Sequence, residues 1–103
     1  MTEIINNLYL CSWEQAKQLV PTFGVVLVVN CTKDLESLGP KTIRIPVDDH
    51  GEIDDTIAMN NHIDNAIEII NSTLQQGISV VVHCQAGRQR SATVIAAYLM
   101  RYH

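Results

Sequence analysis

Cysteine, proline, glycine and charged residues are all scarce in this sequence. Its 103 residues include three cysteines, three prolines and five glycines, and only 17% of them are charged, against 47% hydrophobic. An odd number of widely spaced cysteines does not suit a disulfide framework, and so little glycine and proline excludes a collagen-like or low-complexity chain. We therefore expect free thiols in a reducing, cytoplasmic setting and a single globular domain over residues 1–103.

Positive charge is scarce as well, because seven lysines and arginines face eleven acidic residues, for a net charge of −4. Binding to a nucleic acid backbone needs a basic surface, so we predict no nucleic acid partner. Apolar runs such as Val25–Val29 are too short to cross a bilayer, and no basic amphipathic helix or basic cluster suits a membrane surface. We predict no membrane partner, and the first residues carry no legible targeting signal.

The first twenty residues predict a hairpin followed by a helix. β-prone residues on both sides of an Asn-Asn pair indicate strands over Glu3–Ile5 and Leu8–Leu10. Ser12 followed by Gln15 has the spacing of a capping box. It predicts a helix from there to about Val20, where a proline ends it.

The middle of the chain predicts two strands and a long helix. After Gly24 the run VVLVVN is typical of a strand buried on both faces, and Thr42–Pro46 predicts another strand. The polar stretch VDDHGEIDD indicates an exposed loop, with Thr56 as the cap of a helix that Gly77 ends. That helix carries one apolar stripe at helical spacing, formed by Ile63, Ala66, Ile67, Ile70 and Leu74.

The last part of the chain predicts a strand, a loop and a helix. Ile78–Val82 is an all-apolar strand, and HCQAGRQRS is a loop. Ala92–Arg101 has the composition of a helix whose packing residues are Val94, Ile95, Tyr98 and Leu99. The alternation of strands and helices predicts an α/β fold with a mostly parallel central sheet flanked by helices. A functional site is expected at the carboxyl ends of its strands.

The clearest chemistry lies in this last loop, where five residues separate Cys84 from Arg90, and Ser91 then starts a helix. Backbone N–H groups of such a loop, together with the helix dipole, form a site for an anion such as phosphate. Gly87 allows backbone angles that a side chain forbids. The same positive field stabilises sulfur as a thiolate, so Cys84 is a candidate nucleophile that needs no separate base. A cysteine by itself is more often a small buried hydrophobe, and only this context argues otherwise.

The predicted phosphate-binding segment consists of Gln85, Ala86, Gly87, Arg88, Gln89 and Arg90. Within it, Arg90 offers a planar fork for two phosphoryl oxygens. The pattern of Cys, five residues, Arg and Ser resembles the catalytic loop of the cysteine-based protein tyrosine phosphatases, most closely their dual specificity branch. The likeness extends from NNLYL through VVN and IPVDDH to AAYLM. It implies hydrolysis of phosphorylated Tyr, Ser and Thr of protein partners through a cysteinyl-phosphate intermediate, with no cofactor and no metal.

The resemblance also assigns roles to individual residues. His83 orders the loop and tunes Cys84, while Ser91 assists the loss of the thiolate from the phosphoenzyme; a role for Ser91 only as a helix cap stays open. The general acid of the family lies three residues after the proline position of IPVDDHG. This points to Asp49, with Asp48 as the second choice.

Departures from the family pattern keep other functions open. Gln89 stands where the family commonly has serine, and Arg88 adds a charge shared with phosphatidylglycerophosphate and inositol-lipid phosphatases. A phospholipid (phosphatidylglycerophosphate or phosphoinositide) phosphatase is therefore the first alternative. A phosphate-binding module without catalysis and a rhodanese-like sulfur transferase are the others.

Family domains continue through further helices beyond the point at which this sequence stops. We therefore expect a fold that lacks the usual C-terminal helices, as a truncated or minimal form or as a homodimer in which a second copy covers the exposed apolar face.

Cys31 follows the apolar run VVLVVN and has two interpretations. Related phosphatases form a disulfide between their nucleophile and a second cysteine, so oxidation is one way to join Cys31 to Cys84. The other interpretation is an inert thiol buried at the end of a strand. The histidines show no metal-ligand spacing, and we predict no metal.

Overall fold

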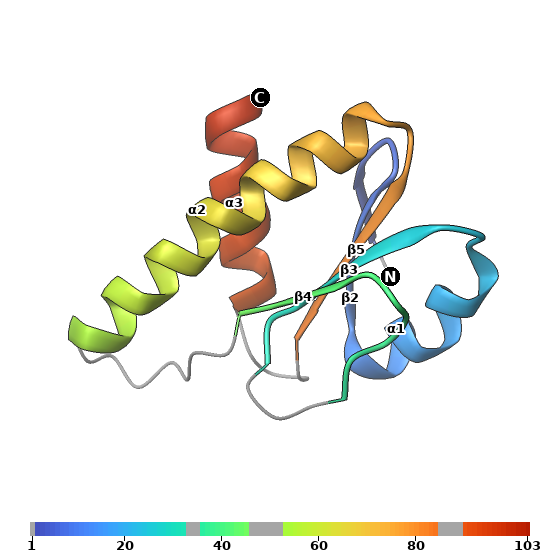
Figure 1. Cartoon of the computed structure of the whole chain (residues 1–103), viewed down its shortest axis with the longest axis horizontal. Helices are drawn as coiled ribbons and strands as arrows, with labels where there is room; N and C mark the ends of the chain where they lie inside the picture. Colours follow the sequence, from blue (N-terminus) through green and yellow to red (C-terminus); the bar gives the residue numbers. More distant parts are fainter. Residues whose placement is uncertain (1, 33–35, 46–52, 85–89) are drawn as a thin grey trace.

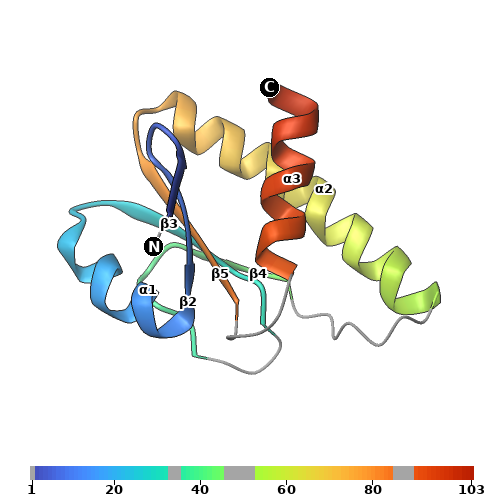
Figure 2. The same cartoon turned by 180° about the vertical axis from the view of Figure 1, so that it is seen from behind.

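The chain folds as a β-sheet with helices on both faces, shown in Figure 1 and from behind in Figure 2. The computed structural model describes residues 2–32, 36–45, 53–84 and 90–103. Within these ranges the strands are β1 (Thr2–Ile5), β2 (Leu8–Ser12), β3 (Val26–Asn30), β4 (Thr42–Arg44) and β5 (Ser79–Cys84). The helices are α1 (Trp13–Leu19), the short 3₁₀ helix η1 (Val20–Thr22), α2 (Ile53–Gln75) and α3 (Arg90–Tyr102).

The amino-terminal hairpin and helix form where the sequence predicts them. β1 pairs antiparallel with β2, and the turn places Asn7 at a φ of 73°, a left-handed conformation that asparagine tolerates better than most residues. The capping box of α1 is complete. The Gln15 N–H donates to Ser12 Oγ at 3.2 Å, and the Ser12 N–H donates to Gln15 Oε1 at 3.1 Å. These two bonds fix the point at which β2 turns into α1.

All other strand pairs are parallel. The sheet order is β1-β2-β5-β3-β4, so β5 lies between β2 and β3 although it is the last strand in sequence. Residues 8–12 pair with residues 80–84, and residues 26–30 pair with residues 79–83. Every residue of β3 is buried, as are the last five of β5, which explains why both strands are nearly continuous apolar runs. The predicted mostly parallel α/β fold is confirmed.

α2 and α3 cover one face of the sheet (Figure 1). The predicted apolar stripe of α2 is confirmed. Leu74 packs against the core, and the other four residues of the stripe are buried: Ile63, Ala66, Ile67 and Ile70. Gly77 follows the helix at a φ of +77°, and its N–H donates to the Leu74 carbonyl at 3.0 Å. This is the left-handed glycine that commonly ends a helix. From α3, Val94, Ile95 and Tyr98 complete the core on this face.

α1 and η1 cover the opposite face with a smaller core. It consists of Cys11, Ala16, Val20, Val26, Val28 and Val81. Because side chains alternate along a strand, Val81 and His83 of β5 project toward α1, whereas Val82 and Cys84 project toward α2 and α3. The last two residues of β5 therefore contribute to opposite sides of the sheet.

Some element boundaries differ from the sequence predictions. α2 begins at Ile53, so Thr56 lies inside the helix and the prediction that it caps the helix is wrong. An acidic stretch indicated a loop there, but acidic residues are also favoured in the first turn of a helix, so composition did not locate the boundary. β4 ends earlier than predicted, at Arg44. β5 runs on through His83 and Cys84, because β2 offers backbone partners over its whole length.

Ile70→Ala should lower the free energy of unfolding by about 2 to 5 kcal/mol, because the Ile70 side chain is fully buried and its removal leaves a cavity. Ile69 provides a matched control on the same helix, since it is 42% exposed. Ile69→Ala should cost less than about 1 kcal/mol. Urea unfolding followed by circular dichroism measures both variants. Equal losses would contradict the assignment of the buried face of α2.

Candidate active site

Cys84 and Ser91 meet at the carboxyl edge of the sheet. Cys84 is the last residue of β5, and Ser91 lies in the first turn of α3. Cys84 Sγ is 2.9 Å from Ser91 Oγ, and the two residues are only 6% and 5% exposed. The strand and the helix thus bring the candidate nucleophile against a hydroxyl group.

Arg90 is the first residue of α3, so it belongs to the helix rather than to the loop in which the sequence analysis placed it. Its side chain is buried at 5% exposure. A buried guanidinium at the amino terminus of a 13-residue helix adds a full positive charge to the partial charge of the helix dipole. Such a field favours a bound anion, such as phosphate, at this edge of the sheet.

A row of side chains crosses the sheet one residue before Cys84. The strand register places Cys11 beside His83, His83 beside Asn30, and Asn30 beside Arg44. Residues in register on neighbouring parallel strands project from the same face, here the face that α1 covers. Four strands therefore contribute one residue each to a largely polar layer next to the active edge.

His83 is fully buried within this row, and no described residue forms a hydrogen bond with either of its ring nitrogens. Burial lowers the pKa of His83 from its ordinary 6.5 to about 4, and the positive charge of Arg44 acts in the same direction. The imidazole is therefore neutral at physiological pH. Its backbone carbonyl accepts the N–H of Cys31 at 2.8 Å, which ties β5 to the chain after β3. These features describe a buried, neutral side chain, and the role of His83 in ordering the loop and tuning Cys84 stays a prediction.

Arg44 and Asn30 were not among the residues predicted for the site, yet they hold the chain that follows β3. Arg44 donates from Nη1 to the Thr32 carbonyl at 3.1 Å and from Nη2 to Ser37 Oγ at 3.2 Å. The Thr32 N–H and hydroxyl both donate to Asn30 Oδ1, the N–H at 3.0 Å. The sequence shows that Asn30 ends an apolar run and that Arg44 stands between two isoleucines, but not the strand register that brings the two side by side.

The two cysteines near Cys84 are buried thiols. Burial raises the pKa of Cys31 to about 12, and a negative charge on Cys84 adds to the shift while Arg90 opposes it. Burial likewise raises the pKa of Cys11 to about 11. The structure thus agrees with the buried-thiol interpretation of Cys31, and its disulfide with Cys84 stays a prediction.

Several predicted site residues lie outside the described part of the chain. They are Asp48, Asp49, Gln85, Ala86, Gly87, Arg88 and Gln89, and their roles stay predictions. In the ranges that the structure describes, no group of three His, Cys, Asp or Glu residues is placed to hold a metal ion. None of the helices in these ranges is long and apolar enough to span a membrane.

The buried neutral state of His83 predicts a pH-dependent stability. Because the folded-state pKa is near 4 and the ordinary value is 6.5, the unfolded chain binds a proton in this window that the folded protein does not. The free energy of unfolding should therefore fall as pH decreases from about 6.5 to about 4, by up to about 1.4 kcal/mol per pH unit. Urea unfolding at a series of pH values measures this slope.

His83→Asn should remove this part of the slope, whatever its effect on overall stability. His62→Asn is the control, because His62 is exposed, and it should keep the slope of the unmodified protein. An NMR titration that finds the His83 imidazole half protonated near pH 6.5 in the folded protein would refute the assignment.

The sequence matches the family model described as dual specificity phosphatase, catalytic domain, over residues 8–103. It is 34% identical over 100 residues to 123R of Invertebrate iridescent virus 6, named as a tyrosine phosphatase, with 97% of this chain and 67% of the viral protein covered. It is 33% identical over 105 residues to the tyrosine-protein phosphatase yvh1 of Schizosaccharomyces pombe, covering 98% of this chain and 31% of yvh1.

Dual specificity protein phosphatase 9 of Homo sapiens is 34% identical over 106 residues, which cover 96% of this chain and 27% of the human protein. The chain therefore spans about a third or less of the length of yvh1 and of the human phosphatase.

Solved structures share the fold. A mouse dual specificity phosphatase complexed with zinc tungstate has a TM-score of 0.75 and 26% sequence identity, with 97% of this chain and 64% of the mouse chain covered. OH1 of Orf virus, described as a tyrosine phosphatase with triple substrate specificity, has a TM-score of 0.77 and 23% identity, covering 98% of this chain and 59% of OH1. The family model matches nearly the whole length of the sequence, and the sheet delivers Cys84 to the start of α3. The chain thus belongs to the dual specificity phosphatase family.

Proposed function

We propose that this protein is a cysteine-dependent phosphatase that hydrolyses phosphomonoesters on the Tyr, Ser or Thr residues of partner proteins. The observation that carries the proposal is the contact between Cys84 Sγ and Ser91 Oγ, 2.9 Å apart at the amino terminus of α3. A sulfur at the end of a buried strand, with the buried guanidinium of Arg90 on the same helix turn as Ser91, suits a tetrahedral anion. Tungstate, present in the similar mouse phosphatase, is a tetrahedral oxyanion.

In the proposed first step, the Cys84 thiolate attacks phosphorus. The sulfur–phosphorus bond forms while the bond between phosphorus and the leaving oxygen breaks, and Arg90 and the start of α3 stabilise the charge on the remaining oxygens. The leaving oxygen needs a proton, and the resemblance assigns its supply to Asp49. The product of this step is a cysteinyl phosphate and the free hydroxyl of the substrate.

In the proposed second step, water attacks the phosphorus of the cysteinyl phosphate. Asp49, now a carboxylate, accepts a proton from this water, and the sulfur–phosphorus bond breaks to release inorganic phosphate. The Ser91 hydroxyl lies 2.9 Å from the sulfur, so it can donate a hydrogen bond to the departing thiolate. This contact supports a part for Ser91 in the second step. Ser91 is the second residue of α3, so the alternative that it caps the helix is wrong.

Protein phosphoesters are the favoured substrates, because the similar proteins are named as tyrosine or dual specificity protein phosphatases. Arg88 is the feature that favours a phospholipid, since a second cation in the loop suits a headgroup with more than one charged group. A phosphate-binding module without catalysis would not need a nucleophile at Cys84. The two substrate classes are separated by direct assay.

Cys84→Ser should abolish hydrolysis, because a serine hydroxyl is a far weaker nucleophile than a thiolate. Phosphotyrosine peptide, phosphothreonine peptide and phosphatidylglycerophosphate are assayed side by side by phosphate release, with the Cys84→Ser protein as the blank. Ser91→Ala is the companion variant, which keeps the nucleophile and should accumulate cysteinyl phosphate detectable by intact mass. Activity that persists in Cys84→Ser would contradict the mechanism, and release from the lipid alone would contradict the substrate class.

Asp49→Asn should slow the turnover of substrates with poor leaving groups, such as alkyl phosphates, by about 10²- to 10⁴-fold. A substrate with a good leaving group, such as 4-nitrophenyl phosphate, needs little protonation and should lose much less. The dependence of kcat/KM on leaving-group pKa measures this difference. Asp48→Asn is the matched control next to it, and a larger effect of Asp48→Asn on the same series would move the acid to that residue.

A further inference from the structure

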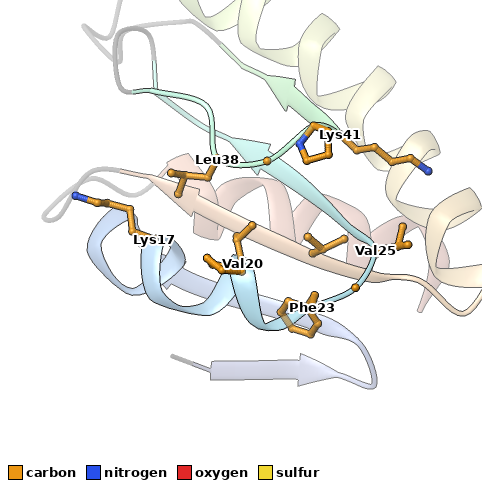
Figure 3. Close-up of a pocket in the computed structure, with 11 residues that line it drawn as sticks. Lys17, Val20, Phe23, Val25, Leu38 and Lys41 are labelled. Atoms are coloured by element: carbon orange, nitrogen blue, oxygen red, sulfur yellow. The ribbon is translucent and has the colours of Figure 1, made fainter.

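A groove lies beside α1 and η1, on the face of the sheet opposite α2 and α3 (Figure 3). It runs between η1 and the residues that precede β4, reaches the start of β3, and has a volume of about 460 Å³. This is within the usual range for sites that take a small ligand or a few side chains of a peptide. Its main side chains are Lys17, Val20, Phe23, Val25, Leu38 and Lys41.

The groove is apolar, and its rim leaves apolar surface in contact with water. Val20 and Val26 lie deep, at 8% and 7% exposure, whereas Val25 at the rim is 54% exposed. Gly39 contributes space. Its φ is +97°, which a residue with a side chain rarely adopts, and a Cβ there would lie 3.4 Å from a methyl group of Val20. A partner that covers Val25 and Leu38 would remove this apolar surface from water.

The part of the groove at Val26 is separate from the active site both along the strands and across the sheet. Val26 pairs with Ser79 at the start of β5, five residues before Cys84 at its end, a separation of about 17 Å along a strand. Val26 also belongs to the core beneath α1, whereas Cys84 belongs to the core beneath α2 and α3. A ligand over Val26 therefore does not cover Cys84, which lies on the other side of the sheet.

Positive charge marks both ends of the groove. Figure 3 shows Lys17 and Lys41 at opposite ends, and no acidic residue is among the described residues that line it. Lys17 Nζ lies 4.1 Å from the centre of the Trp13 ring, which holds one ammonium group at its end of the groove. In the described ranges neither lysine forms an ion pair with a carboxylate. On a protein with a net charge of −4, this is a local cationic site.

We propose that this groove docks an extended segment of a partner protein in which apolar side chains are flanked by acidic residues on both sides. The apolar side chains lie over Val20, Phe23 and Val25, and the two acidic flanks face Lys17 and Lys41. Binding here is independent of the proposed phosphatase activity, because no lining residue belongs to the active site. The groove would bind a phosphorylated partner at a site distant from its phosphate, while Cys84 attacks the phosphorus.

The two separated lysines favour a peptide over a fatty acid. A fatty acid has one carboxylate and can neutralise only Lys17 or only Lys41, whereas a peptide carries acidic side chains on both flanks of an apolar stretch. The groove is also bordered by exposed residues of two separate segments, 21–25 and 39–41, which suits an occupant that extends beyond both ends. The partner is therefore identified by the pattern acidic, apolar, acidic.

Fluorescence anisotropy with a series of fluorescein-labelled peptides tests the proposal. Each peptide has two aspartates on either side of a short stretch of Leu, Val and Phe, and its charge-reversed version has lysines in their place. The acidic peptides should bind with a Kd on the order of 10 to 100 μM at low salt, and the lysine versions at least tenfold more weakly. The Cys84→Ser protein should bind the peptides with the same affinity. Failure of the docking proposal can therefore be told apart from failure of the phosphatase proposal.

Variants of the groove have matched controls elsewhere on the molecule. Val25→Asp should weaken binding about tenfold or more, whereas Met100→Asp, at a residue that is 87% exposed on α3, should leave it unchanged. The double change Lys17→Gln and Lys41→Gln should weaken it about five- to tenfold and flatten its salt dependence, whereas Arg101→Gln should not. Thermal unfolding checks that each variant is folded.

The proposal fails if no acidic peptide of the series binds with a Kd below about 1 mM. It also fails if neither Val25→Asp nor the lysine changes alter the Kd of the peptides. It also fails if laurate binds in the groove, detected by NMR shifts at Val25 and Val26, while the peptides do not.

Discussion

The parallel pairing of β5 with β2 on one side and β3 on the other determines where the candidate active site of this protein lies. It carries Cys84 to the carboxyl edge of the sheet, where α3 begins. Parallel strands end at a common edge, so the candidate nucleophile, a helix dipole and a buried arginine meet there. The backbone bond from the Cys31 N–H to the His83 carbonyl extends this pairing beyond the end of β3.

Successive side chains of β5 point to opposite faces of the sheet, so its last two residues lie in different surroundings. Cys84 projects into the side of the sheet that α2 and α3 cover, and there it meets Ser91. His83 projects to the other side, in register with Asn30, where burial and the charge of Arg44 keep its imidazole neutral. Arg90 and α3 therefore contribute positive charge at the candidate active edge, and the neutral histidine adds none to the row that it shares with Arg44.

Elements with a strong periodic pattern were predictable from the sequence. The stripe from Ile63 to Leu74, the valine runs of β3 and β5 and the capping box at Ser12 all form as expected, because burial and local hydrogen bonds act over a few neighbouring residues. The start of α2 was predicted at Thr56 but lies at Ile53, because an acidic stretch is compatible with both a loop and a first helical turn. The motif at Cys84 likewise predicted the partner Ser91, which lies close in sequence. Arg44 was missed because its part depends on strand register, which joins residues far apart in the chain.

The burial of Cys11 and Cys31 has a consequence for anyone who designs an inhibitor. Their pKa values of about 11 and 12 keep both sulfurs protonated at neutral pH, and a protonated sulfur reacts slowly with electrophiles. An electrophilic inhibitor directed at Cys84 would therefore react little with Cys11 or Cys31. A covalent inhibitor of the proposed active site is thus directed to Cys84 and away from the protonated thiols of Cys11 and Cys31.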